Sequence, residues 1–341
     1  MTSESVLWLA PPQHLPHSLA ALREATNRRD RHHTPPDHPR IPERDPREAV
    51  FDEYFAVSRC ACAPAPLLIG ALDDTLAAVR AFSRHPDGSS TEPDLDLAAH
   101  AAGLDSRTDN REPRTQATVH QRWIQGHRLF FALTQATVVA LRHALRAPSP
   151  ASSALGLETA AHFLRASASA LRITASFDAQ DYHDTVRPSM APPQAPPGFS
   201  GLWSADHRVL VQSLREWGLA APAKSSTLRP AHRRLVEVLT EVHHAHVGVC
   251  SRFVGSAPSL LRGAEPGVRV LDRLCQRRRT ALDAAPAARP AQLPQSTTKT
   301  SPFTTERSLD APATGRENRL GPAASASLPA TTNSTAVRVA R

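Results

Sequence analysis

The chain has 341 residues and a formal net charge of +8, from 40 Lys and Arg against 32 Asp and Glu. The arginines are spread along the sequence, and the compact basic cluster Arg277–Arg279 falls at the end of a predicted helix, where positive charge complements the helix dipole. This pattern does not favour a nucleic-acid partner. Because the first residues lack a signal-peptide pattern and no apolar run is long enough to span a bilayer, we expect a soluble, cytoplasmic protein with no membrane partner.

Both ends of the chain are predicted to be disordered. Residues 1–46 are crowded with Pro, His, Arg and Asp, whereas residues 283–341 are mostly Ala, Pro, Thr and Ser, and neither segment has a sustained apolar period. Such segments cannot bury enough apolar surface to offset the entropy lost on ordering. Residues 47–282 are therefore predicted to form the single folded domain.

Helical periods dominate this folded body. Apolar residues recur at spacings of three and four around residues 69–83, 113–146, 154–175, 204–217, 229–254 and 266–281. The segment Arg187–Gly201 is rich in proline and is predicted to be a loop. Because no segment alternates at period two, the fold class is predicted to be all-α, a helical bundle with a long Pro-rich loop and disordered termini.

The cysteines are few and do not match a structural zinc site. Cys60, Cys62, Cys250 and Cys275 fit no zinc spacing and are too few for a disulfide scaffold. In a helix, the thiols of Cys60-Ala-Cys62 would lie on different faces. We therefore predict that this pair is inert.

One histidine and one cysteine are predicted to share a buried helix face. His246 falls on the apolar stripe of the helix predicted at residues 229–254, and Cys250 follows one turn later. This offset suits a histidine that binds heme iron while the cysteine reaches a vinyl group at the porphyrin edge. The alternative is a core histidine beside a free buried thiol.

Three further histidines are candidates. His207 lies in the first turn of a helix that Ser204 can cap, just after the Pro-rich loop. His120 and His127 lie on the apolar stripe of the long helix predicted at residues 113–146. Each alone could be a surface or core histidine. Together, in a sequence without the Glu-x-x-His sets of di-iron bundles, they favour heme over di-iron.

Three motifs resemble those of one heme superfamily, in the same order along the chain. The segment His246–Gly255 resembles the proximal-histidine segment of tryptophan 2,3-dioxygenases, His120-Gln121 resembles their distal motif, and Pro197–Gly201 is similar to their substrate loop. The pattern of His207, His246 and Cys250 resembles that of heme-dependent tyrosine hydroxylases, in particular the 3-methyl-L-tyrosine peroxygenases. The resemblance covers about residues 110–280.

The resemblance implies a tryptophan 2,3-dioxygenase-like heme-binding catalytic domain. The resemblance also implies that the enzyme uses hydrogen peroxide to convert L-tyrosine or 3-methyl-L-tyrosine to a catechol, in natural-product (antibiotic) biosynthesis. Because the superfamily tends to associate, a homo-oligomer is expected. His246 would be the proximal iron ligand, and Cys250 would form a single thioether to the heme. His120 would be the distal acid–base residue.

Two roles in this scheme have alternatives. His207 would be a second axial iron ligand or would hydrogen-bond the phenol of the substrate. Either Arg187 or Arg208 would bind the carboxylate of the amino acid.

Other functions are also considered. The segment Ser256–Gly263 lacks the Gly/Thr/Ser-rich loop that closes over tryptophan in the dioxygenases, which disfavours a tryptophan or indole dioxygenase. A non-enzymatic alternative is a heme protein for electron transfer or sensing, with His207 and His246 both permanently bound. A helical nucleic-acid binder is disfavoured, because the sequence contains no segment that resembles a recognition helix with clustered base-reading side chains. The sequence does not decide between tyrosine and 3-methyltyrosine.

Overall fold

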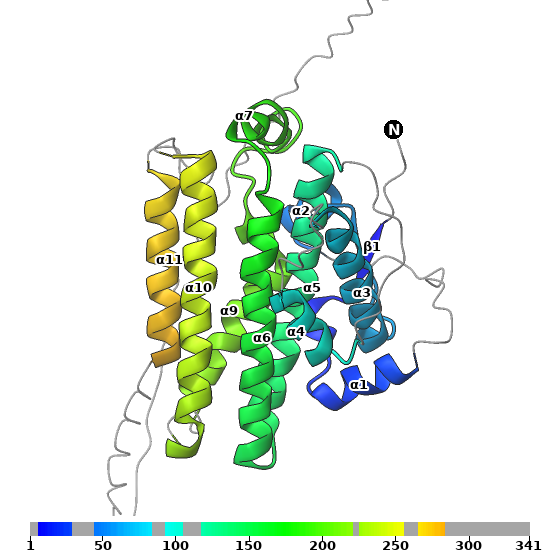
Figure 1. The fold of residues 1–341 in the computed structure, drawn as a ribbon, viewed down its shortest axis with the longest axis vertical. Coiled ribbons are helices and arrows are strands. Elements are labelled where there is room, and N and C mark those ends of the chain that lie inside the picture. The colour runs from blue at the N-terminus through cyan, green and yellow to red at the C-terminus, as the bar shows by residue number, and fades with distance from the viewer. Residues whose placement is uncertain are drawn as a thin grey trace, which may run out of the picture. The chain divides into compact units, whose positions relative to one another are not determined.

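The helices predicted from the apolar periods are present in the computed structural model (Figure 1). The structure describes residues 6–28, 44–83, 93–104, 117–220, 225–255 and 265–283. The segment Ser256–Gly263 and the tail from residue 284 onward lie outside the described residues. All of the described elements belong to one unit, Met1–Arg289. The all-α fold class is confirmed.

The elements follow one another in this order. They are β1 (Leu7–Leu9), η1 (Pro12–His14), α1 (Leu19–Asn27), α2 (Pro46–Tyr54), β2 (Val57–Arg59), α3 (Pro64–Ser83), α4 (Pro93–Ala101), α5 (Val119–Arg146), α6 (Pro150–Thr174), α7 (Ala179–Asp181), the π-turn η2 (Tyr182–Val186), α8 (Arg187–Ser189), η3 (Gly201–Trp203), α9 (Ala205–Leu219), η5 (Ser226–Leu228), α10 (Arg229–Phe253) and α11 (Gly267–Asp283). Among the described residues, no helix combines the length and apolarity that a membrane crossing requires.

The long helices α5 and α6 form the centre of the bundle. A capping box starts α5, in which the Thr118 side chain accepts from the Gln121 N–H and the Gln121 side chain accepts from the Thr118 N–H. Gly126 lets α6 come close, since a Cβ there would lie 1.8 Å from the Thr174 hydroxyl oxygen. The sequence pair His120-Gln121 is thus part of a helix start.

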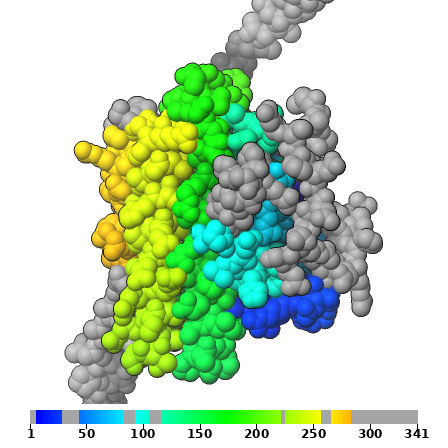
Figure 2. Space-filling view, in the orientation of Figure 1, coloured from blue at the N-terminus to red at the C-terminus, as the bar shows by residue number. Residues whose placement is uncertain are grey.

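Three helices cover this pair on one side. α10 packs along α6, and α11 lies beside α10 (Figures 1 and 2). α9 packs on α5 and against α11. Gly218 lets α11 approach α9, because a Cβ there would lie 2.0 Å from the Ala281 carbonyl oxygen. The Trp217 indole N–H donates to His232 Nδ1 at 3.0 Å, which joins α9 to α10. The histidines of α9 and α10 are thereby brought to one side of the bundle.

The N-terminal segment departs from the prediction of disorder. Residues 6–28 are ordered: β1 pairs in parallel with β2, and α1 buries Leu19 and Leu22 in the core. Leu9 of β1 is also fully buried. The two short strands β1 and β2 left no signal in the sequence, because a three-residue strand is too short to show a period and draws its stability from pairing with a distant segment.

The cysteine pair near the N-terminus is also corrected. Cys60 and Cys62 follow β2 in a turn that leads into α3, and their sulfurs are joined in a disulfide. The prediction had placed them in a helix, with the thiols on different faces. Outside a helix, residues two apart along the chain can approach each other.

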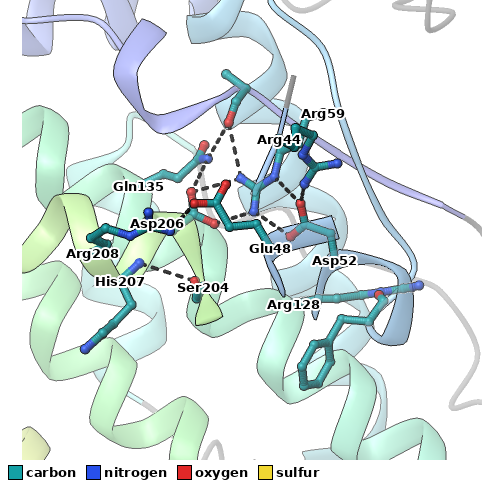
Figure 3. Close-up of polar contacts among 12 residues, drawn as sticks. Arg44, Glu48, Asp52, Arg59, Arg128, Gln135, Ser204, Asp206, His207 and Arg208 are labelled. Carbon is teal, nitrogen blue, oxygen red and sulfur yellow. Dashed lines mark hydrogen bonds and ion pairs between the residues drawn. The ribbon is translucent and has the colours of Figure 1, made fainter. Parts of the chain in front are cut away.

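A buried polar network ties the N-terminal strands to the histidine side of the bundle (Figure 3). The Arg59 guanidinium donates to both oxygens of Asp52, at 2.8 and 3.0 Å, and to both oxygens of Asp206, at 2.9 and 2.8 Å. The Gln135 side chain donates to Asp206 and to the Ala10 carbonyl oxygen, both at 2.8 Å. Charges out of water require such compensation, because an unpaired buried ion is strongly destabilising.

This network sets the start of α9. Asp206 lies in the first turn of the helix, and the Ser204 side chain caps it by accepting from the His207 N–H at 3.3 Å. Figure 3 shows Asp206 turned toward Arg59 while the adjacent His207 side chain points away from the network. The arginine thus holds the backbone from which His207 projects.

Removing Asp206 tests how far the fold depends on this network. We expect Asp206→Ala to lower the free energy of unfolding by about 3–5 kcal/mol, because it leaves a buried arginine with one carboxylate. The matched control is Glu48→Gln, which breaks the pair with the exposed Arg208 and should cost less than about 1 kcal/mol. Urea denaturation followed by circular dichroism measures both. Equal costs for the two variants would contradict this assignment.

Candidate functional site

A cavity of about 320 Å³ lies between α5, α9, α10 and α11. Its walls are mostly aromatic and aliphatic, and its polar lining is rich in histidine and arginine. Its imidazole and guanidinium groups and the Cys250 thiol come from separate elements: His127 from α5, Arg187 from α8, His207 from α9, His243, His246 and Cys250 from α10, and Arg278 from α11. The lining contains no carboxylate among the described residues.

His246 and Cys250 lie one turn apart on α10, and both line the cavity. Burial, with a smaller contribution from Arg278, lowers the pKa of His246 to about 4, so the imidazole is neutral and keeps a free lone pair. Burial raises the pKa of Cys250 to about 11, so the thiol keeps its proton. A neutral imidazole is the form that binds iron, and a thiol is the form that adds to an alkene.

His207 reaches the same cavity from α9. Burial lowers its pKa to about 3, with a further contribution from the positive charge of Arg278. Arg278 Nη2 donates to His207 Nε2 at 2.7 Å, so the neutral ring carries its proton on Nδ1. The structure therefore brings His207, His246 and Cys250 together around one space.

The structure places His127, and not His120, at this cavity. His127 stacks on Phe55, with ring centroids 4.8 Å apart, and its Nδ1–H donates to the Trp123 carbonyl oxygen at 2.8 Å. Burial lowers its pKa to about 4. His120 lies two turns nearer the start of α5, roughly 10 Å along the helix axis. The two histidines lie on the same apolar stripe of α5, and they differ in that His127 reaches the cavity and His120 does not.

The two candidate arginines occupy different environments. Arg187 lines the cavity beside Tyr182, whose pKa burial raises and the guanidinium charge partly lowers. Its Nη1 atom is buried and has no hydrogen-bond partner among the described residues. Arg208 is exposed and pairs with Glu48 outside this cavity. Of these two candidates, Arg187 is therefore the one placed to bind an anion inside the cavity.

Arg278 is a cavity residue that the sequence reasoning missed. The cluster Arg277–Arg279 was interpreted as a solvated helix end, yet Arg278 turns inward and contacts His207. A signal was present in the helical period: Arg278 continues the stripe of Leu271, Leu274 and Leu282 on α11. The apolar period identified the inward face of this helix better than the charge cluster did.

The donor set fits an iron porphyrin better than a bare metal ion. Within the described ranges, no group of three or more His, Cys, Asp or Glu side chains is arranged to hold a metal. A porphyrin supplies four nitrogen ligands itself and needs only axial ligands from the protein, such as imidazoles. The neutral rings of His207 and His246 in an apolar cavity match this requirement.

The fold and site define an all-α protein with a buried aromatic cavity that presents neutral imidazoles. A family model described as "SfmD 3-methyl-L-tyrosine peroxygenase" matches residues 6–235. The chain belongs to this family, and the resemblance found in the sequence is confirmed. The matched stretch contains His127, Arg187 and His207 and ends before His246.

A curated relative and a solved structure are also similar to this chain. A "3-methyl-L-tyrosine peroxygenase" from Streptomyces lavendulae is 36% identical over 158 residues, a match of 42% of this chain and 41% of that protein. The match thus spans less than half of the relative. The solved structure "Crystal structure of reduced SfmD by soaking with sodium hydrosulfite" has a TM-score of 0.52 at 20% identity, over 72% of this chain and 97% of that chain, and shows a shared fold.

Burial of His127 predicts an acid-sensitive fold. An unfolded histidine takes up a proton near pH 6.5, whereas folded His127 resists until about pH 4. Between these values the unfolded state binds more protons, so the free energy of unfolding falls as the pH falls, by up to about 1.4 kcal/mol per pH unit for this group.

We expect His127→Phe to remove this part of the slope, because a phenyl ring keeps the stacking on Phe55 but cannot titrate. Urea denaturation at several pH values across that window measures the slope for both proteins. An unchanged slope in the variant would show that His127 titrates normally in the folded state.

Proposed function

We propose that this protein is a heme-dependent peroxygenase that hydroxylates the ring of L-tyrosine or 3-methyl-L-tyrosine to a catechol with hydrogen peroxide. The observation that carries the proposal is the meeting of His207, His246 and Cys250 at one aromatic cavity. Membership of the peroxygenase family supports it. We expect the product to serve natural-product biosynthesis, as the sequence resemblance implies.

Three side chains would hold the cofactor. His246 of α10 would be an iron ligand, and His207, from a different helix, would be a second imidazole ligand. Cys250 would hold the porphyrin covalently, through a single thioether to a vinyl group. When bound, heme would supply the iron centre that activates hydrogen peroxide for oxygen transfer.

His127 takes the acid–base role that the sequence reasoning assigned to His120. Its Nδ1–H is held by the Trp123 carbonyl oxygen, so Nε2 is the free acceptor. A neutral Nε2 at the cavity can accept a proton from hydrogen peroxide and return it to the departing oxygen. His207 would move aside to admit the oxidant or would hydrogen-bond the phenol.

Arg187 would orient the substrate. Its buried, unpartnered Nη1 can donate to the carboxylate of an aromatic amino acid. The ring of the substrate would pack against the aromatic wall, which includes Phe55, Phe199 and Tyr182. The same wall excludes water, which strengthens the pairing of the guanidinium with a carboxylate.

Turnover with purified, heme-loaded protein tests the proposal. We expect hydrogen peroxide to add one oxygen atom to 3-methyl-L-tyrosine or L-tyrosine, detected by mass spectrometry. His127→Gln should lower the rate by roughly 10²–10⁴-fold through loss of proton transfer. The matched control His120→Gln, on the same helix but outside the cavity, should keep the wild-type rate.

Two results would favour the alternative functions. Ring-opened tryptophan formed with oxygen and without peroxide would indicate a dioxygenase. A low-spin spectrum that neither amino acid changes, without turnover, would indicate an electron-transfer or sensor protein.

The thioether predicts how firmly the heme is held. Wild-type heme should stay with the protein in acidified organic solvent, whereas heme from Cys250→Ala should be extracted. Cys275→Ala is the matched control, because Cys275 is a free, buried thiol that lines the same cavity from α11. Free extraction of wild-type heme would contradict the covalent link.

A further inference from the structure

A second cavity, of about 420 Å³, lies between α9 and α11 and is strongly basic. Its lining includes Arg208, Arg215, Arg277 and Arg278, and it contains no carboxylate among the described residues. Arg208 is neutralised by Glu48, which lies outside this lining. We refer to this space as the arginine groove. It offers several guanidinium groups to an anion.

The arginine groove adjoins the histidine cavity. Leu202, His207, Leu274 and Arg278 line both spaces. Arg278 is largely buried, and burial lowers the pKa of its guanidinium. Its described hydrogen-bond partner is the neutral His207 ring, at 2.7 Å. A cation taken partly out of water is poorly compensated when its partner among the described residues is a neutral acceptor, since arginine pairs best with the two oxygens of a carboxylate.

We propose that the arginine groove binds the propionate carboxylates of the porphyrin and that Arg278 transfers its hydrogen bond from His207 to a propionate as heme enters. The inference rests on the heme-dependent function proposed above. Heme has an apolar macrocycle with its two carboxylates at one edge, and the apolar cavity beside a basic groove complements this division. The transfer would free His207 Nε2, which Arg278 occupies in the present structure.

A carboxylate at this place could also come from the amino-acid substrate. Arg187 already provides an unpartnered donor for that group inside the histidine cavity. Arg278 lies at the boundary with the groove, beside the proposed iron ligand. These positions favour the porphyrin as the source of the carboxylate at Arg278, and the experiment distinguishes the two.

The test measures equilibrium binding of two iron porphyrins to the heme-free protein. Iron mesoporphyrin IX has no vinyl groups, so Cys250 cannot form a thioether and binding is reversible. Its dimethyl ester has the same macrocycle but no carboxylates. We expect wild-type protein to bind the free acid at least about tenfold more tightly than the ester, because charged hydrogen bonds to arginine are lost.

The variants locate the effect. Arg278→Gln should weaken binding of the free acid by about tenfold and leave binding of the ester unchanged. Arg279→Gln is the matched control, because this neighbouring residue is exposed and lines neither cavity; it should bind both porphyrins as wild type does.

Each remaining outcome is decisive. Equal affinity of wild-type protein for the acid and the ester would overturn the inference, whether or not the variant folds. A loss with Arg278→Gln that is the same for both porphyrins, or that affects only L-tyrosine binding, would also overturn it. If wild-type protein binds neither porphyrin, the proposed heme-dependent function itself fails.

Discussion

The buried arginine of β2 is the constraint on which the rest of the site depends. Arg59 cannot be left unpaired out of water, and it is shared by Asp52 of α2 and Asp206 of α9. One side chain therefore ties the N-terminal strand pair, a short helix and the start of α9 together. Since His207 follows Asp206 directly, the electrostatic demand of the core also places an imidazole at the cavity.

Burial then sets the chemistry of the cavity. His127, His207 and His246 line a cavity that has no carboxylate among the described residues. Desolvation keeps these three imidazoles neutral, and the charge of Arg278 adds to this effect for His207 and His246. The same burial keeps Cys250 protonated. A cavity of this kind holds its ligands and its nucleophile in the uncharged forms that a porphyrin requires. An acidic residue among them would reverse this balance by favouring imidazolium.

The apolar period predicted which residues share a helix face, but it did not predict how deep each of them lies in the fold. His120 and His127 are seven residues apart on one helical stripe, so the pattern could not separate them, and only the tertiary structure shows that His127 lines the cavity. The sequence likewise could not separate Arg187, which lines the cavity, from Arg208, which is exposed. Arg278 was assigned to a solvated helix end because charge was given more weight than its place on an apolar stripe.

The sequence by itself determined what depends on neighbours along a helix: the main helices, the all-α class, and the shared face of His246 and Cys250. Helix geometry is local, so spacing suffices for these. Only the tertiary structure decided the pairing of β1 with β2 and the meeting of His207 with His246 at one cavity. These contacts join segments whose separation is set by packing, hydrogen bonding and compensation of buried charge, which no local period records.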